Sequence, residues 1–295
     1  MSLTLKRTPA AGTAPAAPAK RRLAASPGTF LIWGGMGLFL ILLLGVVSSV
    51  VVNSFAKEWF DTWLPSGYTP TWYADAWKEY DLGQVIGTTL TVSVAVVGIS
   101  VLIGAPASYV LARRRFPGKG ILMLIFLLPI MMPPITYGIP LATLLTYYHL
   151  APGLTGVILA NLVPSIPFVI LTMTPFIEQI NPSIESAARM CGANMVRLFT
   201  KILAPLLVPG ILAAAVLVLV RTVGMFELTF LTSDSTSDTL VVALFTAMTG
   251  AGIRAQQSVD AMAVVYMLMM MVLLVVALRF VNPTQLVSQV REETD

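Results

Sequence analysis

The residues of this chain that could do chemistry are few and widely separated. Cys191 is the only cysteine and His149 the only histidine, so the sequence has neither an internal disulfide nor a clustered metal site. The stretch FPGKG at 116–120 lacks the first glycine and the final hydroxyl of a phosphate-binding loop, so we expect no ATP site of that kind. We therefore predict no catalytic residue, no metal and no cofactor.

The composition places the chain in a membrane. Of its 295 residues, 57% are hydrophobic and 11% charged, and the mean hydropathy is +0.85. A helix needs about 20 mostly apolar residues to cross a bilayer. The sequence predicts an all-α integral membrane protein with six transmembrane helices, at 30–52, 83–111, 121–147, 154–177, 206–231 and 259–281.

The domain boundaries follow from these spans. Residues 1–28 read as a disordered cytoplasmic tail, although their basic, acid-free composition leaves a transit or signal peptide open. A first helix and an external loop occupy 29–82, the main transmembrane domain occupies 83–281, and a second tail occupies 282–295. A polar segment at 178–205 interrupts the main domain.

The basic residues predict the orientation, because cytoplasmic loops carry an excess of lysine and arginine. With both termini in the cytoplasm, only Lys57, Lys78 and Arg254 lie outside and Arg221 lies within a span. The other basic residues are then inside: Lys6, Arg7, Lys20, Arg21, Arg22, Arg113, Arg114, Arg115, Lys119, Arg189, Arg197, Lys201, Arg279 and Arg291.

The polar segment predicts a short helix and a turn. Asn181 suits an N-cap, Pro182 the first helical position, and Glu185 the positive end of the helix. Gly192 then supplies a turn before an amphipathic stretch resumes. Such a segment could rest on anionic lipid. The small surface of Ala187 and Ala188 beside the glycine instead favours a protein docking surface.

The stretch ESAARMCGANMVRLFTKILAPLLVPG, residues 185–210, resembles the EAA loop of bacterial ABC-importer permeases. Ser186 and Ala204 depart from that pattern. The likeness covers about residues 83–281, which correspond to the five-helix core of the binding-protein-dependent permeases, with one further helix in front. The matching positions are Glu185, Ala187, Ala188, Gly192, Ala193, Phe199, Ile202, Pro205, Pro209 and Gly210.

The resemblance implies that residues 178–205 couple the membrane helices to a separate ATPase. Glu185 is then the polar contact, while Ala187, Ala188, Gly192 and Ala193 allow close approach. The implied partners are two cytoplasmic ATPase subunits that bind the ATP, a second permease subunit, a periplasmic substrate-binding protein and membrane lipid, with no nucleic acid. The implied location is the bacterial inner membrane. The polyamine, opine and iron-type branch is favoured for substrate, with sugars or organic anions as the alternative.

Four residues are candidates for a translocation pathway: Arg221, Glu227, Thr89 and Tyr137. A charge inside a span is costly, so Arg221 must face protein or water, and an ion pair to another helix is the favoured explanation. Prolines in the third and fourth spans predict bent or locally unwound helices. A secondary transporter and a membrane enzyme are the rival classes, but the sequence shows no internal repeat and no clustered acids or nucleophiles.

Overall fold

The computed structural model describes residues 27–59, 62–250 and 255–280, and these are helical almost throughout. The expected tails at 1–28 and 282–295 lie outside the described residues, apart from the first two positions of α1. The chain divides into a unit ending at Ser48 and a second unit from Ser49 onward. The helices are α1 (Pro27–Phe55), α2 (Thr71–Glu79), α3 (Leu82–Arg113), α4 (Lys119–Met131), α5 (Pro134–Tyr147), α6 (Leu154–Gln179), α7 (Pro182–Met190), α8 (Met195–Arg197), η1 (Leu198–Leu203), α9 (Ala204–Val223), α10 (Glu227–Thr232), α11 (Leu240–Thr249) and α12 (Gln256–Phe280).

Five helical stretches are long and apolar enough to cross a membrane, and a sixth span is possible if one bent pair is counted. The five are Phe30–Phe55, Leu82–Arg113, Leu154–Gln179, Met195–Val223 and Gln256–Arg279. This confirms the all-helical membrane class. Phe30–Phe55 contains no charged residue, and its few polar residues lie near its C-terminal end.

The third predicted span, 121–147, is broken, as its prolines predicted. It consists of α4 and α5, which meet at an angle of 98°. Met132 has an extended backbone and Pro133 precedes the first residue of α5. Because proline disfavours a helical conformation in the preceding residue, the Met132-Pro133-Pro134 run ends α4. In contrast, α6 remains one helix although it contains three prolines.

The fifth predicted span also has different bounds. Helical structure begins at Met195, passes through a π-helical turn at Leu198–Leu203, and ends at Val223. Residues 224–226 leave the helix, and α10 begins at Glu227. The short apolar helix α11, which the sequence did not predict, follows α10.

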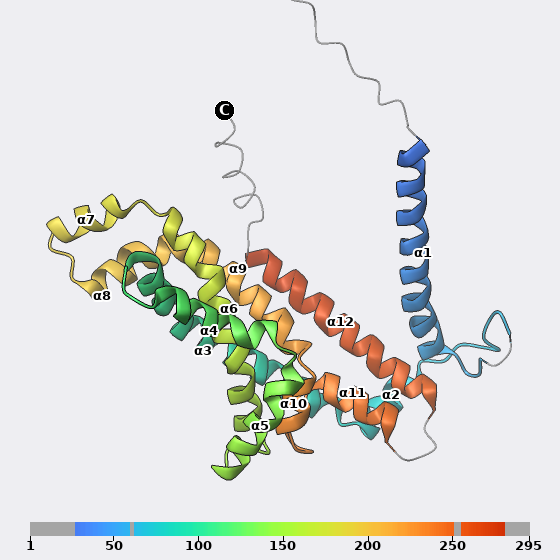
Figure 1. Ribbon diagram of the computed structural model, residues 1–295. Coiled ribbons are helices and arrows are strands. Elements are labelled where there is room, and N and C mark those ends of the chain that lie inside the picture. The colour runs from blue at the N-terminus through green and yellow to red at the C-terminus, as the bar shows by residue number, and fades with distance from the viewer. Residues whose placement is uncertain (1–26, 60–61, 251–254, 281–295) are drawn as a thin grey trace, which may run out of the picture. The chain divides into compact units, whose positions relative to one another are not determined.

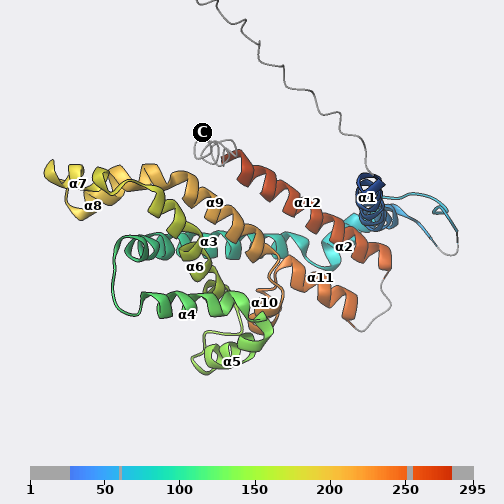
Figure 2. The same ribbon diagram turned by 45° about the horizontal axis from the view of Figure 1, so that its top comes forward.

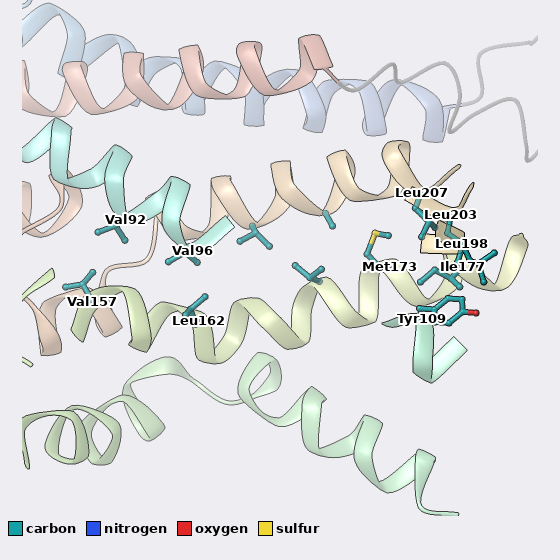
Figure 3. Packing of buried hydrophobic residues seen from close by; sticks show 13 residues of the cluster. Val92, Val96, Tyr109, Val157, Leu162, Met173, Ile177, Leu198, Leu203 and Leu207 are labelled. Atoms are coloured by element: carbon teal, nitrogen blue, oxygen red, sulfur yellow. The ribbon is translucent and has the colours of Figure 1, made fainter. Parts of the chain in front are cut away.

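The core of the second unit lies where α3, α6 and α9 pack together. Gly104 on α3 permits this approach, because a Cβ there would lie 2.7 Å from a methyl of Val169 on α6. In both views α7 and α8 lie at one end of this bundle, and α5 and α10 lie toward the other (Figures 1 and 2). The apolar cluster reaches the α7 end, where Tyr109 lies near Ile177 and Leu198 (Figure 3).

Candidate functional site: the α7–α8 segment and a polar cluster on α5, α6, α9 and α10

The start of α7 forms as its residues predict. The side chain of Asn181 accepts a hydrogen bond of 2.9 Å from the backbone amide of Ser183, and Pro182 is the first helical residue. Asn194 caps α8 in the same way, by accepting a bond of 2.8 Å from the amide of Arg197. These two caps fix where each short helix begins, because each satisfies an amide that has no partner within its helix.

The turn between α7 and α8 depends on Gly192. Its φ is +79°, a left-handed conformation that costs other residues about 1–2 kcal/mol. Within the chain, a Cβ at this position would meet nothing within 4 Å. The chain's own packing therefore requires the glycine for its backbone conformation and leaves open space beside it. Ala193 closes the turn through its amide, which donates 3.0 Å to the carbonyl of Ala188.

Glu185 faces the interior of this chain. It is the one buried residue of α7, with 7% of its surface exposed. The hydroxyl of Tyr109 donates to its Oε2 over 2.6 Å, and Nε of Arg113 donates to its Oε1 over 2.7 Å. Both of its carboxylate oxygens are thus bonded within the chain, and its contact with an ATPase stays a prediction.

The sequence did not identify Tyr109 and Arg113 as site residues. Arg113 served only as one of the charges that set the orientation. The available signal was their spacing, because residues four apart lie on one face of a helix. Both lie in the last turns of α3, and that face meets α7. Their partner, Glu185, lies 76 residues after Tyr109 and 72 after Arg113. Local sequence patterns cannot predict a contact between residues so far apart.

The outward surface of α7 and α8 is partly apolar. Met190 is 84% exposed and Val196 is 69% exposed, and Ile184 and Met195 are also exposed. Ala187 lies on the exposed side of α7, whereas Ala188 is half-buried and packs against the core. We call the exposed group Ile184, Ala187, Met190, Met195 and Val196 the α7–α8 surface.

The second cluster lies inside the membrane part, where α5, α6, α9 and α10 come together. The guanidinium carbon of Arg221 on α9 lies 5.7 Å from the ring centroid of Phe168 on α6, within cation–π range. Arg221 and Glu227 are both within electrostatic range of Tyr137 on α5. The Tyr137 hydroxyl is buried and has no hydrogen-bond partner among the described residues.

The expected ion pair of Arg221 is not found. Across residues 27–59, 62–250 and 255–280, the structure has one salt bridge, which joins Arg113 to Glu185. Arg221 and Glu227 are both half-buried on the side facing this cluster of helices. Residues 224–226 leave the helix, so Arg221 lies on α9 and Glu227 on α10.

Thr89 has a structural use in α3. Its hydroxyl donates 2.7 Å to the carbonyl of Val85 and accepts 2.9 Å from the amide of Leu240, the first residue of α11. Thr91 and Ser93 likewise bond to carbonyls one turn back. Thr89 therefore joins α3 to α11, and of the four pathway candidates it alone lies outside the polar cluster.

No group of three or more histidine, cysteine, aspartate or glutamate side chains is arranged to hold a metal ion in the part of the chain that the structure describes. The site consists instead of an apolar surface on two short helices and a polar cluster between longer ones. Such an arrangement is typical of a multi-pass membrane permease.

The family comparison agrees with this class. The family described as "Binding-protein-dependent transport system inner membrane component" matches residues 104–284, more than half of the chain. The chain belongs to this family, whose members are ABC-importer permeases.

Individual relatives differ in what they are named for. The chain is 37% identical to the trehalose transport system permease protein SugB of Mycobacterium tuberculosis, over 41% of this chain and 44% of that protein. It is 28% identical to the sulfate transport system permease protein CysT of Salmonella typhimurium, over 68% of this chain and 73% of that protein. The alignments with the first curated relatives span 44 to 66% of those proteins' own length.

A solved structure has the same fold. A crystal structure of a bacterial ABC transporter involved in the import of the acidic polysaccharide alginate aligns with a TM-score of 0.66, over 91% of this chain and 98% of the other. The sequence identity is 18%, so this likeness concerns the fold alone.

Proposed function

We propose that this chain forms half of the translocation pathway of an ABC importer and is driven by separate ATPase subunits that dock on the α7–α8 surface. The observation that carries the proposal is the exposure of Met190 and Ile184 on the capped helix α7, which lies outside the apolar spans. Exposed apolar patches of this kind mark interaction sites. Two ATPase subunits, a second permease subunit and a periplasmic binding protein complete the assembly.

Substitution of Met190 by glutamate tests the docking. The change puts a charge at the centre of the apolar surface and touches no buried group, so we expect the affinity for the purified ATPase subunits to fall at least tenfold. Binding is measured with the chain in nanodiscs. Ser183→Glu, on the exposed first turn of α7, is the control for added charge. If Met190→Glu weakens binding to anionic vesicles but leaves ATPase binding unchanged, the segment is a lipid-binding loop.

For the pathway, we propose the cluster of Tyr137, Phe168, Arg221 and Glu227. An aromatic face, a donor, an acceptor and a hydroxyl together suit a solute that carries many hydroxyl groups. The polyamine or opine class that the sequence favoured finds no support in the relatives' names, which include trehalose and sulfate. We therefore favour a sugar over an oxyanion, because Glu227 would repel an anion beside Arg221.

For orientation, we propose that both termini and the α7–α8 segment are cytoplasmic. In a Cys191→Ser background, a cysteine at the exposed position Ser66 should react with an impermeant thiol reagent in intact cells. Native Cys191 is also exposed and should react only after the cells are opened. The comparison uses two exposed thiols, so it reports the side of the membrane rather than burial. Labelling of Cys191 in intact cells contradicts the orientation and, with it, the ATPase docking.

A further inference from the structure

We infer that Arg113 is the residue that sets the orientation of α7 for ATPase docking, by tying this helix to both α3 and α6. The inference rests on the proposed function for its consequence, because docking is what the orientation serves. The contacts that carry it, however, are all within this chain. They involve Tyr109 and Arg113 on α3, Ile180 at the end of α6, and Glu185 on α7.

The guanidinium of Arg113 contacts two elements at once. Its Nε donates 2.7 Å to Oε1 of Glu185, and its Nη2 donates 2.6 Å to the backbone carbonyl of Ile180, the residue that caps the C-terminus of α6. The last carbonyls of a helix lack partners within the helix and form its negative end. The guanidinium of Arg113 therefore bonds to one of these carbonyls and also to Glu185 of α7.

Glu185 is held on both of its oxygens. Arg113 bonds to one oxygen and the Tyr109 hydroxyl to the other, over 2.6 Å. The ring of Tyr109 also contacts Phe199 of the π-helical turn edge-on, with centroids 4.7 Å apart. One face of α3 thus contacts three elements: the end of α6, helix α7 and the π-helical turn η1.

This contact is the main attachment of α7. Glu185 is the one buried residue among its nine, and the rest of the helix is exposed apart from half-buried Ala188. A short helix whose one apolar contact with the core is a half-buried alanine gains little from hydrophobic burial to fix its direction. The Arg113–Glu185–Tyr109 contact therefore determines which side of α7 carries Met190 and Ala187 outward. A movement of α7 is passed to α3 and α6 through the same bonds.

A lysine cannot replace this arginine. The planar guanidinium presents separate N–H groups to the carboxylate and to the carbonyl, whereas an ammonium group on a flexible stem has no fixed fork. Arg114 provides the matched control, since it is the neighbouring residue, is exposed, and caps α3 with its backbone.

The test compares Arg113→Lys with Arg114→Lys in nanodiscs. A nitroxide on native Cys191, which is exposed just after α7, reports how firmly α7 is held. We expect a more mobile label and at least tenfold weaker ATPase binding for Arg113→Lys, with the wild-type values for Arg114→Lys. Adding Glu185→Gln to Arg113→Lys should weaken binding little further, because the two residues act as one unit.

The thermal unfolding of the bundle separates a positioning role from general destabilisation. If Arg113 positions α7, Arg113→Lys should weaken ATPase binding while the melting temperature of the bundle stays close to that of the wild type. Should Arg113→Lys prove poorly folded, Tyr109→Phe removes one of the three bonds with almost no change of volume, and a smaller change in the same direction is expected. An immobile label together with wild-type binding in either variant overturns the inference. Absence of ATPase binding by the wild-type chain contradicts the proposed function instead, while the label still reports on the Arg113 contact.

Discussion

Arg221→Met should leave the complex assembled and stable but lower uptake at least tenfold. The reason lies in its surroundings: the described residues give Arg221 no salt-bridge partner, and its guanidinium lies against the ring of Phe168. Removing one partner of a buried ion pair commonly costs about 3–5 kcal/mol, because the other charge is stranded. Losing a cation–π contact costs only about 0.5–2 kcal/mol. We therefore expect a small change in melting temperature.

The measurement is uptake of radiolabelled trehalose and of sulfate by proteoliposomes, together with thermal unfolding of the same preparation. Arg221→Lys is the matched control, since it keeps the positive charge and should keep more of the uptake. If Arg221→Met instead loses several kcal/mol of stability, the role of Arg221 is structural, as one partner of an ion pair between helices. Normal uptake by a stable Arg221→Met complex would remove this residue from the pathway.

Gly192→Trp should abolish the coupling of ATP hydrolysis to transport, while Gly192→Ala should retain most of it. Both variants carry the strain of a side chain at φ +79°, about 1–2 kcal/mol, so that contribution cancels between them. They differ in size, and the space beside Gly192 is empty within this chain. An indole there projects from the turn beside the α7–α8 surface and should keep the ATPase from approaching.

The readout is ATP hydrolysis by the reconstituted complex, with and without the loaded binding protein. We expect the stimulation by the loaded binding protein to fall at least tenfold in Gly192→Trp. Equal stimulation in the two variants would show that the turn is not part of the docking surface, whatever the role of α7 itself.

Local sequence patterns predicted what depends on local interactions. Runs of apolar residues identified the membrane-crossing helices, and Asn181 with Pro182 predicted where α7 begins, because an N-cap bonds to an amide only two or three residues on. The break at Met132–Pro133 was harder to place. The chain has prolines within α3, α4, α5, α6 and α9, and only packing determines which of them ends a helix.

The interior role of Glu185 could not be predicted in this way. Its partners on α3 are reached only when α3 packs along α6 and brings Arg113 to the start of α7. The same holds for Arg221, whose expected ionic partner is replaced by an aromatic ring from another helix. In both cases the residue type was noted correctly, but its partner was set by packing between distant segments.

The central claim is that transport through this chain is driven by ATP hydrolysis in separate subunits that dock on α7 and α8. It is tested most directly by measuring uptake into proteoliposomes that contain the chain with its second permease, with the loaded binding protein always present and the ATPase subunits present or absent, while ATP and the ion gradient are varied independently. We predict uptake only with ATPase subunits and ATP, unaffected by collapse of the gradient, and lost on substitution of Met190 by glutamate. Uptake by the permease subunits alone, driven by an ion gradient without ATP, would contradict the account.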